Sequence, residues 1–178
     1  MIGFLRFVGI LNAAVWFGGA IFFTFATAPA VFSDDMRALL EAKNYPYFSG
    51  AIAQIMISRY FKVQLICGII ALLHLLAERL YLGKTPEARS LSLLTGLLSI
   101  TLLGGFWLQP KLRELHTIRY RATTGQEVRD AARASFQTWH GVSMALNLVM
   151  IAGLGFYLWR VANPPESTRF LIPGQFRG

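Results

Sequence analysis

Polar side chains interrupt the last apolar run of the chain, residues 142–159. His140, Ser143 and Asn147 follow one another at steps of three and four residues, so they share one face of a helix. Gln64, in an earlier apolar run, is expected at a comparable depth. Such a set forms either a polar track for a transported solute or a hydrogen-bonded contact between helices, worth roughly 0.6 kcal/mol per pair. Because no carboxylate accompanies Asn147 to supply a transporter's coupling charge, we predict a helix–helix contact.

A copper site is the first alternative use of these side chains. His140 and Met144 lie one turn apart, and His116 is expected at the same membrane side. Imidazole and thioether groups suit Cu(I). The sequence has no methionine triplet or Cys-x-x-Cys, and methionine is also an ordinary filler of cores. We therefore keep copper binding by His116, His140 and Met144 as an alternative only.

His74 is the candidate ligand for a tetrapyrrole. Its depth differs from that of His140 by roughly 20 Å at 1.5 Å per residue, so the two cannot share one haem iron. A single-histidine site at His74 stays an alternative. The simpler interpretation is a buried histidine that is hydrogen-bonded to a neighbouring helix or paired with Glu78, four residues on. We predict no resident cofactor.

Four apolar runs must position these residues. Hydrophobic residues make up 54% of the 178-residue chain and charged residues 15%, against about a quarter charged in soluble domains. A helix needs about 20 mostly apolar residues to cross the hydrocarbon core. We therefore predict an all-α polytopic membrane protein with four transmembrane helices, a four-helix bundle, built on residues 7–32, 63–77, 91–108 and 142–159.

Two long helical connections are predicted on one membrane face, called here the connection side. Ser33 and the two aspartates after it can cap a short helix through Lys43, and the next helix starts near Pro46 and continues into the second span. The third helix is predicted to continue past Pro110. Thr124 and Glu127 match a capping box, which starts the fourth helix near residue 125. On the opposite face, Gly83 and Pro86 delimit a short turn.

Small and aromatic residues add two expectations about packing. Glycines would let helices approach closely, and aromatic residues near the ends of the runs would lie at the headgroup level. A glycine pair, a proline, a helical connection, a phenylalanine and a span also occur twice in this order. This pattern indicates an internal duplication or two helix pairs that use similar boundary residues. The glycines are Gly18, Gly19, Gly104, Gly105, Gly153 and Gly155; the aromatic residues are Trp16, Tyr60, Trp107, Trp139, Tyr157 and Trp159; the repeated positions are Pro29 with Pro110 and Phe61 with Phe136.

The remaining composition narrows the function classes. The formal net charge of +8 fits basic loops that face anionic lipid headgroups, and no basic stretch shows the pattern of nucleic-acid binding. The single cysteine, Cys67, excludes a disulfide within the chain. The phosphate-binding glycine loop, GxSxG and HExxH are absent from the sequence. We predict a protein that is not an enzyme.

Several segments together resemble a known family. They are WFGGAIFFTFATAPAVF at residues 16–32, Tyr60-Phe61, the LQPK segment at residues 108–111, and FQTWHGVSMALN at residues 136–147. They resemble the bacterial domain of unknown function 4149, related to transmembrane protein 205 of eukaryotes, up to about Trp159. The resemblance implies a four-helix integral membrane fold, here in the bacterial inner membrane, and implies no catalytic or ligand residues. A looser likeness to copper-resistance membrane proteins supports the copper alternative.

The C-terminal tail carries the prediction of partners. Residues 1–162 are expected to form the transmembrane domain, and residues 163–178 a polar tail with three prolines and no core of its own. Such a tail becomes ordered against another surface, anchored here by Phe170, Leu171, Ile172 and Phe176. We therefore predict a non-catalytic accessory or structural subunit of a larger membrane complex, for example a respiratory or photosynthetic one. Its partners would be lipids and other membrane subunits, and the alternative is a copper- or tetrapyrrole-handling membrane protein.

Overall fold

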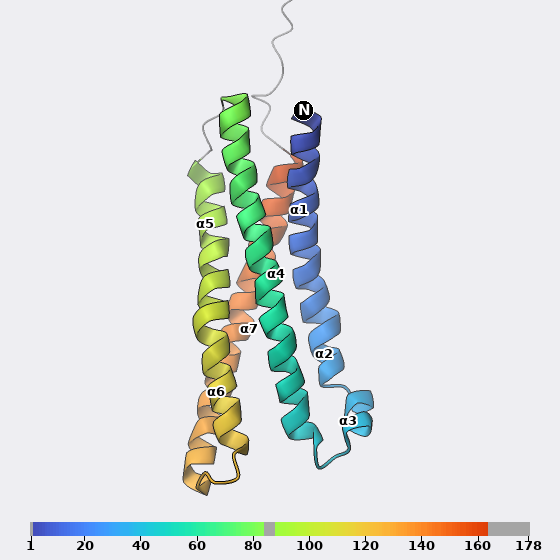
Figure 1. The fold of residues 1–178 in the computed structure, drawn as a ribbon, viewed down its shortest axis with the longest axis vertical. Coiled ribbons are helices and arrows are strands. Elements are labelled where there is room, and N and C mark those ends of the chain that lie inside the picture. Colours follow the sequence, from blue (N-terminus) through green and yellow to red (C-terminus); the bar gives the residue numbers. More distant parts are fainter. Residues whose placement is uncertain (1, 84–87, 164–178) are drawn as a thin grey trace, which may run out of the picture.

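Four helical rods run side by side in the computed structural model, which describes residues 2–83 and 88–163 (Figure 1). Within these residues the chain is helical and has no strand. Four stretches are long and apolar enough to cross a membrane, Gly3–Val31, Tyr45–Tyr81, Ala88–Tyr120 and Gln126–Ala162, so the predicted all-α membrane fold is confirmed. The elements are α1 Ile2–Phe22, η1 Phe23–Thr27, α2 Ala28–Val31, α3 Asp34–Leu40, α4 Tyr45–Leu82, α5 Ala88–Leu103, η2 Gly104–Leu108, α6 Gln109–Tyr120 and α7 Gln126–Ala162.

A π-helical turn precedes each of two prolines. The π-helical segments η1 and η2 end two residues before Pro29 and Pro110. In both places the residue after the segment donates its backbone N–H to the carbonyl five residues back. Proline has no N–H, and its ring clashes with the carbonyl four residues earlier, so the helix passes it by widening one turn. The helices on either side of each proline therefore form one continuous rod. The first rod comprises α1, η1 and α2, the second α4, the third α5, η2 and α6, and the fourth α7.

The first long connection contains the predicted short helix, α3. Ser33 caps it, because its side-chain oxygen accepts a hydrogen bond from the backbone N–H of Met36 at 3.2 Å. The predicted end at Lys43 is wrong: α3 ends at Leu40, since Glu41 has a φ of 62° and so leaves the helical conformation. Helix α4 then begins beside Pro46, as predicted, and runs for 38 residues.

The second long connection leads into α7 without the predicted capping box. Gly125 occupies the cap position, and no side chain caps the first turn. The start of α7 near residue 125 is confirmed, but the pairing of Thr124 with Glu127 is wrong. Arg129, in the first turns of α7, instead donates from its guanidinium to the carbonyl of Ala122 at 2.9 Å. At the other end of α4, Gly83 adopts the left-handed conformation with a φ of 63°, as its sequence position predicted.

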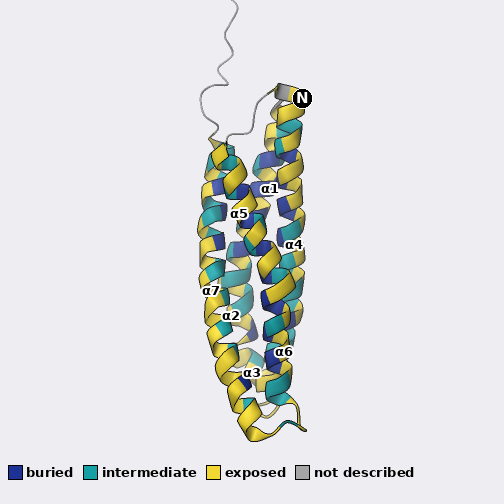
Figure 2. Ribbon diagram, turned by 90° about the vertical axis from the view of Figure 1, so that its left-hand side faces the viewer, coloured by how far each residue is buried: buried dark blue, intermediate teal, exposed yellow. Residues whose placement is uncertain are grey.

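The buried residues of the bundle turn inward and the exposed ones outward (Figure 2). Trp16, Leu94 and Leu154 are fully buried in its core. Trp16 meets Tyr157 edge to face, with ring centroids 5.9 Å apart. Both rings lie inside the bundle, so their prediction as headgroup anchors is wrong. Trp159, in contrast, is exposed.

Some of the predicted close contacts at glycines are present in the structure, and others are not. A Cβ at Gly104 would lie 2.5 Å from the ring of Phe61, so the absence of a side chain there lets α4 approach the third rod. Gly153 is similarly close to Leu97, at 2.9 Å. Around Gly18 and Gly19 no atom lies within 4 Å of such a Cβ, so the predicted close approach at this pair is wrong.

Three points of the first half recur in the second at one interval, although the glycine pairs Gly18-Gly19 and Gly104-Gly105 do not share it. The starts of η1 and η2, and the starts of α4 and α7, are each 81 residues apart (104 − 23 = 126 − 45 = 81). Pro29 and Pro110 have the same spacing, and α1 and α5 begin at the same end of the bundle (Figure 1). This regularity supports the interpretation of a duplicated helix pair. The proposed pairing of Phe61 with Phe136 is wrong, because in this register Phe61 corresponds to Val142.

Candidate functional site

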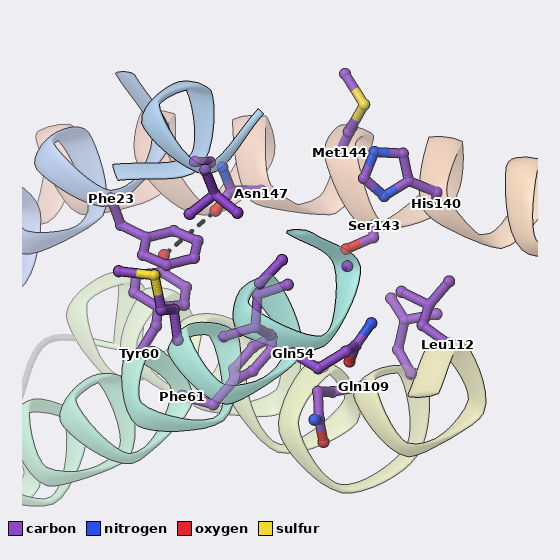
Figure 3. Close-up of a pocket in the computed structure, with 18 of the residues that line it drawn as sticks. Phe23, Gln54, Tyr60, Phe61, Gln109, Leu112, His140, Ser143, Met144 and Asn147 are labelled. Atoms are coloured by element: carbon purple, nitrogen blue, oxygen red, sulfur yellow. Dashed lines mark hydrogen bonds between the residues drawn. The ribbon is translucent and has the colours of Figure 1, made fainter. Parts of the chain in front are cut away.

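A pocket of about 560 Å³ opens between the rods on the connection side of the bundle. Both π-helical segments line it, together with α2, α4, α5, α6 and α7 (Figure 3). On α4 the lining runs from Pro46 to Gln64, which is about 27 Å at 1.5 Å per residue. On α7 it runs from Phe136 to Met150. The pocket is therefore elongated along the bundle, with an outer end near Gly50 and Phe136 and an inner end near Gln64 and Met150.

At the inner end, three polar side chains satisfy one another across three rods. The Tyr60 hydroxyl donates to Oδ1 of Asn147 at 3.2 Å, and Nδ2 of Asn147 donates to Oγ1 of Thr24 at 2.8 Å (Figure 3). The ring of Phe23 stacks on Tyr60, with centroids 4.3 Å apart. Because Thr24 belongs to the widened turn η1, this chain of bonds connects α4, α7 and the first rod.

Gln64, which the sequence assigned to the same polar contact, bonds elsewhere. Its side-chain oxygen accepts the indole N–H of Trp16, and both residues are buried. The predicted set of His140, Ser143, Asn147 and Gln64 does line one pocket. The set does not form one contact, however, because Asn147 bonds to Tyr60 and Thr24 whereas Gln64 bonds to Trp16 on α1. Ser143 and His140 lie further toward the outer end, on the α7 wall (Figure 3).

The outer end holds a buried histidine in a recess made by a glycine. A Cβ at Gly50 would lie only 2.2 Å from Nε2 of His116, so the imidazole occupies the space that a side chain at position 50 would need. The ring lies against Tyr47, Tyr120 and Phe136, with centroid distances of 5.7, 4.9 and 6.4 Å. His116 is therefore held in place by aromatic packing.

Two buried polar atoms at this end have no hydrogen-bond partner within the described part of the chain. They are Nε2 of His116 and Oε1 of Gln54, on side chains that are 7% and 8% exposed. Gln54 lies four residues after Gly50, on the same face of α4. Because Nε2 of His116 lies where a side chain of Gly50 would be, the two unpartnered side chains lie against α4 about one helical turn apart. An unpaired buried polar group costs about 1–3 kcal/mol, so a pair of them at a pocket wall indicates a missing partner.

The charge of the lining is limited to one cation. Among the described lining residues there is no aspartate, glutamate or lysine, and Arg119 is the one arginine. Its guanidinium carbon lies over the ring of Tyr120, 5.0 Å from the centroid. Most of the other lining residues are aliphatic or aromatic. The wall is thus apolar for most of its length, with polar groups at specific points.

The residues of the copper alternative lie at this pocket but differ in exposure. His116 and His140 both line it, and the ring of Phe136 contacts both, stacking on His140 at 5.8 Å. Met144 belongs to the rim, since it is 57% exposed and its thioether extends away from Gln54 (Figure 3). Within the described residues no group of three or more histidine, cysteine, aspartate or glutamate side chains is arranged to hold a metal ion.

His74 lies outside the pocket, near the opposite end of the bundle. Its Nε2 is 2.8 Å from the carbonyl oxygen of Leu5 on α1. A Cβ at Gly9 would lie 2.5 Å from the same nitrogen, so this histidine also occupies a recess made by a glycine. The contact is the hydrogen bond to a neighbouring helix that the simpler interpretation predicted.

Some predicted residues lie outside the described structure, and two residues of the site were not predicted. The tail anchors Phe170, Leu171, Ile172 and Phe176 lie outside the described residues. Gln54 and Gly50 were not predicted as site residues. Gln54 had a usable signal, since it is a single amide within the apolar stretch AIAQIMI. Gly50 had none, because its role depends on a ring from another rod.

Of three comparisons with known proteins, the one with protein families gives a match. A family model described as Domain of unknown function (DUF4149) matches residues 11–121, more than half of the chain. This part includes η1, Gln54, Tyr60 and His116, whereas α7 follows it. No curated protein and no solved structure matches the chain.

Proposed function

We propose that this chain, which belongs to the DUF4149 family, is a non-catalytic integral membrane protein that binds an apolar small molecule between its helices. The pocket between α4, α6 and α7 carries the proposal. Its volume of about 560 Å³ lies within the range of roughly 300–1,000 Å³ that is typical of small-molecule sites. Its walls are mainly apolar with a few polar groups at fixed places, which is the usual chemistry of such sites.

The position of the pocket supports a ligand that arrives from the lipid. Its rim includes Phe32 and Met144, whose side chains are 54% and 57% exposed. Met144 lies within a stretch that is long enough to span a membrane, and Phe32 directly follows another, Gly3–Val31. In a bilayer such exposed apolar side chains contact lipid chains. An apolar molecule dissolved in the membrane can therefore reach the pocket without crossing water.

Filling the pocket tests this function. Ala53 lines the pocket, whereas Ala145 is exposed on α7 and does not line it, so Ala53→Phe and Ala145→Phe form a matched pair. The protein would be photolabelled in lipid nanodiscs with hexadecanol carrying a mid-chain diazirine, and the labelled peptides mapped by mass spectrometry. We expect saturable labelling near Phe61 and Met150 in the parent and in Ala145→Phe, and its loss in Ala53→Phe. Equal labelling of all three proteins would refute the proposal.

The predicted role as an accessory subunit of a larger membrane complex concerns a different surface and stays a prediction. A ligand pocket is compatible with it, because the pocket lies inside the bundle and leaves the outer faces of the rods available. Native mass spectrometry of the gently solubilised protein would detect partner subunits. Recovery of this chain alone would rule out a stable complex while leaving the pocket proposal intact.

A further inference from the structure

We infer that the occupant of the pocket is a single-chain amphiphile whose uncharged hydroxyl head contacts Gln54 and His116. Its chain then extends along the pocket toward Gln64 and Met150. This inference rests on the proposed function and adds the chemical class of the ligand and its direction in the site.

The direction follows from which polar groups are already paired. At the inner end Tyr60, Asn147 and Thr24 bond to one another, and Gln64 bonds to Trp16. These groups have their partners, so an apolar chain can lie against them without breaking a hydrogen bond. At the outer end, the side-chain oxygen of Gln54 and Nε2 of His116 are unpartnered, and both side chains are more than nine-tenths buried. The polar group of a ligand is therefore needed at the outer end.

A hydroxyl head matches these two atoms. The Gln54 oxygen is an acceptor and needs a donor, while a histidine ring nitrogen either donates or accepts according to its tautomer. A hydroxyl group donates one hydrogen bond and accepts others, so one such group can satisfy both atoms. Nε2 of His116 lies where a Cβ of Gly50 would be, and Gln54 follows one turn later on the same face of α4. The two unpartnered side chains therefore adjoin the same face of α4, about one helical turn apart, where one head group can approach both.

The charges around the pocket limit the alternatives. No acidic side chain lines the described part of the wall, so an ammonium head would enter without a counter-charge. A carboxylate head would have one basic partner, Arg119, which lies over the ring of Tyr120. A hydroxyl head needs neither. The class therefore comprises long-chain alcohols, and the acid with the same chain is the comparison that tests the head group.

Competition against the photoreactive hexadecanol probe provides the experiment. Hexadecanol, palmitate, hexadecylamine and hexadecane have matched chains and differ only in the head. We expect hexadecanol to compete about thirtyfold better than hexadecane, because its hydroxyl can form two ordinary hydrogen bonds that hexadecane lacks. The preference should disappear in Gln54→Leu and in His116→Phe. Thr95→Val is the control, because Thr95 does not line the pocket and its hydroxyl bonds to the carbonyl of Leu91 within α5.

Each outcome distinguishes the inference from the function on which it rests. If palmitate or hexadecylamine competes better than hexadecanol, the hydroxyl assignment is wrong. If hexadecane competes equally, the head makes no contact, and the inference falls while the chain-binding function stands. If none of the four competes, the proposed function falls with it.

A second measurement covers the case in which a variant is poorly folded. Replacing the unpartnered Gln54 by leucine should raise the thermal stability of the ligand-free protein, because a buried acceptor without a partner is removed. A lower stability would mean that Gln54 serves the fold, and this would overturn its role as a ligand contact.

Discussion

Asn147 is the side chain through which α7 is hydrogen-bonded to two other rods, and its contribution can be measured. It accepts from Tyr60 at 3.2 Å and donates to Thr24 at 2.8 Å. Hydrogen bonds between membrane helices contribute about 0.6 kcal/mol on average and at most about 1.7 kcal/mol. Two bonds of average strength give about 1.2 kcal/mol for Asn147→Leu. Tyr60→Phe removes one of them and should cost about 0.6 kcal/mol, because the ring can keep its stacking on Phe23.

The double variant separates the bond from other effects of the substitutions. If Tyr60 and Asn147 bond to each other, the double variant loses the shared bond only once. Its destabilisation should then be smaller than the sum of the two single effects by about 0.6 kcal/mol. The measurement is reversible unfolding in mixed detergent micelles, followed by circular dichroism.

A second double-mutant cycle, at two residues that do not contact each other, measures the coupling expected without a direct hydrogen bond. Thr95 on α5 bonds to the carbonyl of Leu91 within its own helix. Gly104 lies against Phe61, the neighbour of Tyr60, and therefore marks the level of Tyr60 on the third rod. Thr95 precedes Gly104 by nine residues, so it lies about 14 Å along the rod from that level. The cycle of Tyr60→Phe with Thr95→Val should therefore be additive. A coupling between Tyr60 and Asn147 no larger than in this control would refute the hydrogen-bonded contact.

Three further predictions concern other parts of the molecule. Gly9→Ala places a Cβ 2.5 Å from Nε2 of His74 and should destabilise the protein by about 1–3 kcal/mol. Gly18→Ala meets no atom within 4 Å and should leave the stability equal or higher. Thermal unfolding compares the two variants, and equal losses of stability would contradict the recess for His74 at Gly9. Ser33→Ala removes the cap of α3 and should cost about 1 kcal/mol locally, seen as faster amide hydrogen exchange at Met36 with no change in α7. Native mass spectrometry with and without residues 164–178 tests the tail, and unchanged partner recovery after truncation would count against its predicted anchoring role.

Much of the architecture could be read from the sequence because local rules decide it. The length of an apolar run decides whether a helix spans a membrane, and prolines with glycines mark where helices start and end. Pro46 and Gly83 therefore located two helix boundaries to within a residue or two. The start of α7 near residue 125 was predicted from a capping box that the structure does not form. The end of α3 was misplaced, because the backbone leaves the helix at Glu41, a residue with no breaker chemistry.

The partners of the polar residues could not be read in this way. Which residues of two helices face each other depends on the rotation of each helix about its axis, and packing against neighbours sets that rotation. The position of Trp16 near the end of an apolar run predicted a headgroup anchor, but the packed bundle turns it inward onto Gln64. Gln64 was grouped with Asn147 because of its expected depth, while the actual partner of Asn147 on α4 is Tyr60.

The sequence by itself determined four membrane-spanning rods, the side of the bundle that carries the long connections, and the polar residues that the rods bring into the membrane. Only the tertiary structure decided that these rods enclose a pocket and that Gly50 makes room in it for His116. It also decided that Gln54 and His116 lack partners while Asn147 and Gln64 have them. The reason is physical: helix formation follows from residues close in the chain, whereas a cavity and an unpaired atom depend on what other rods place beside them.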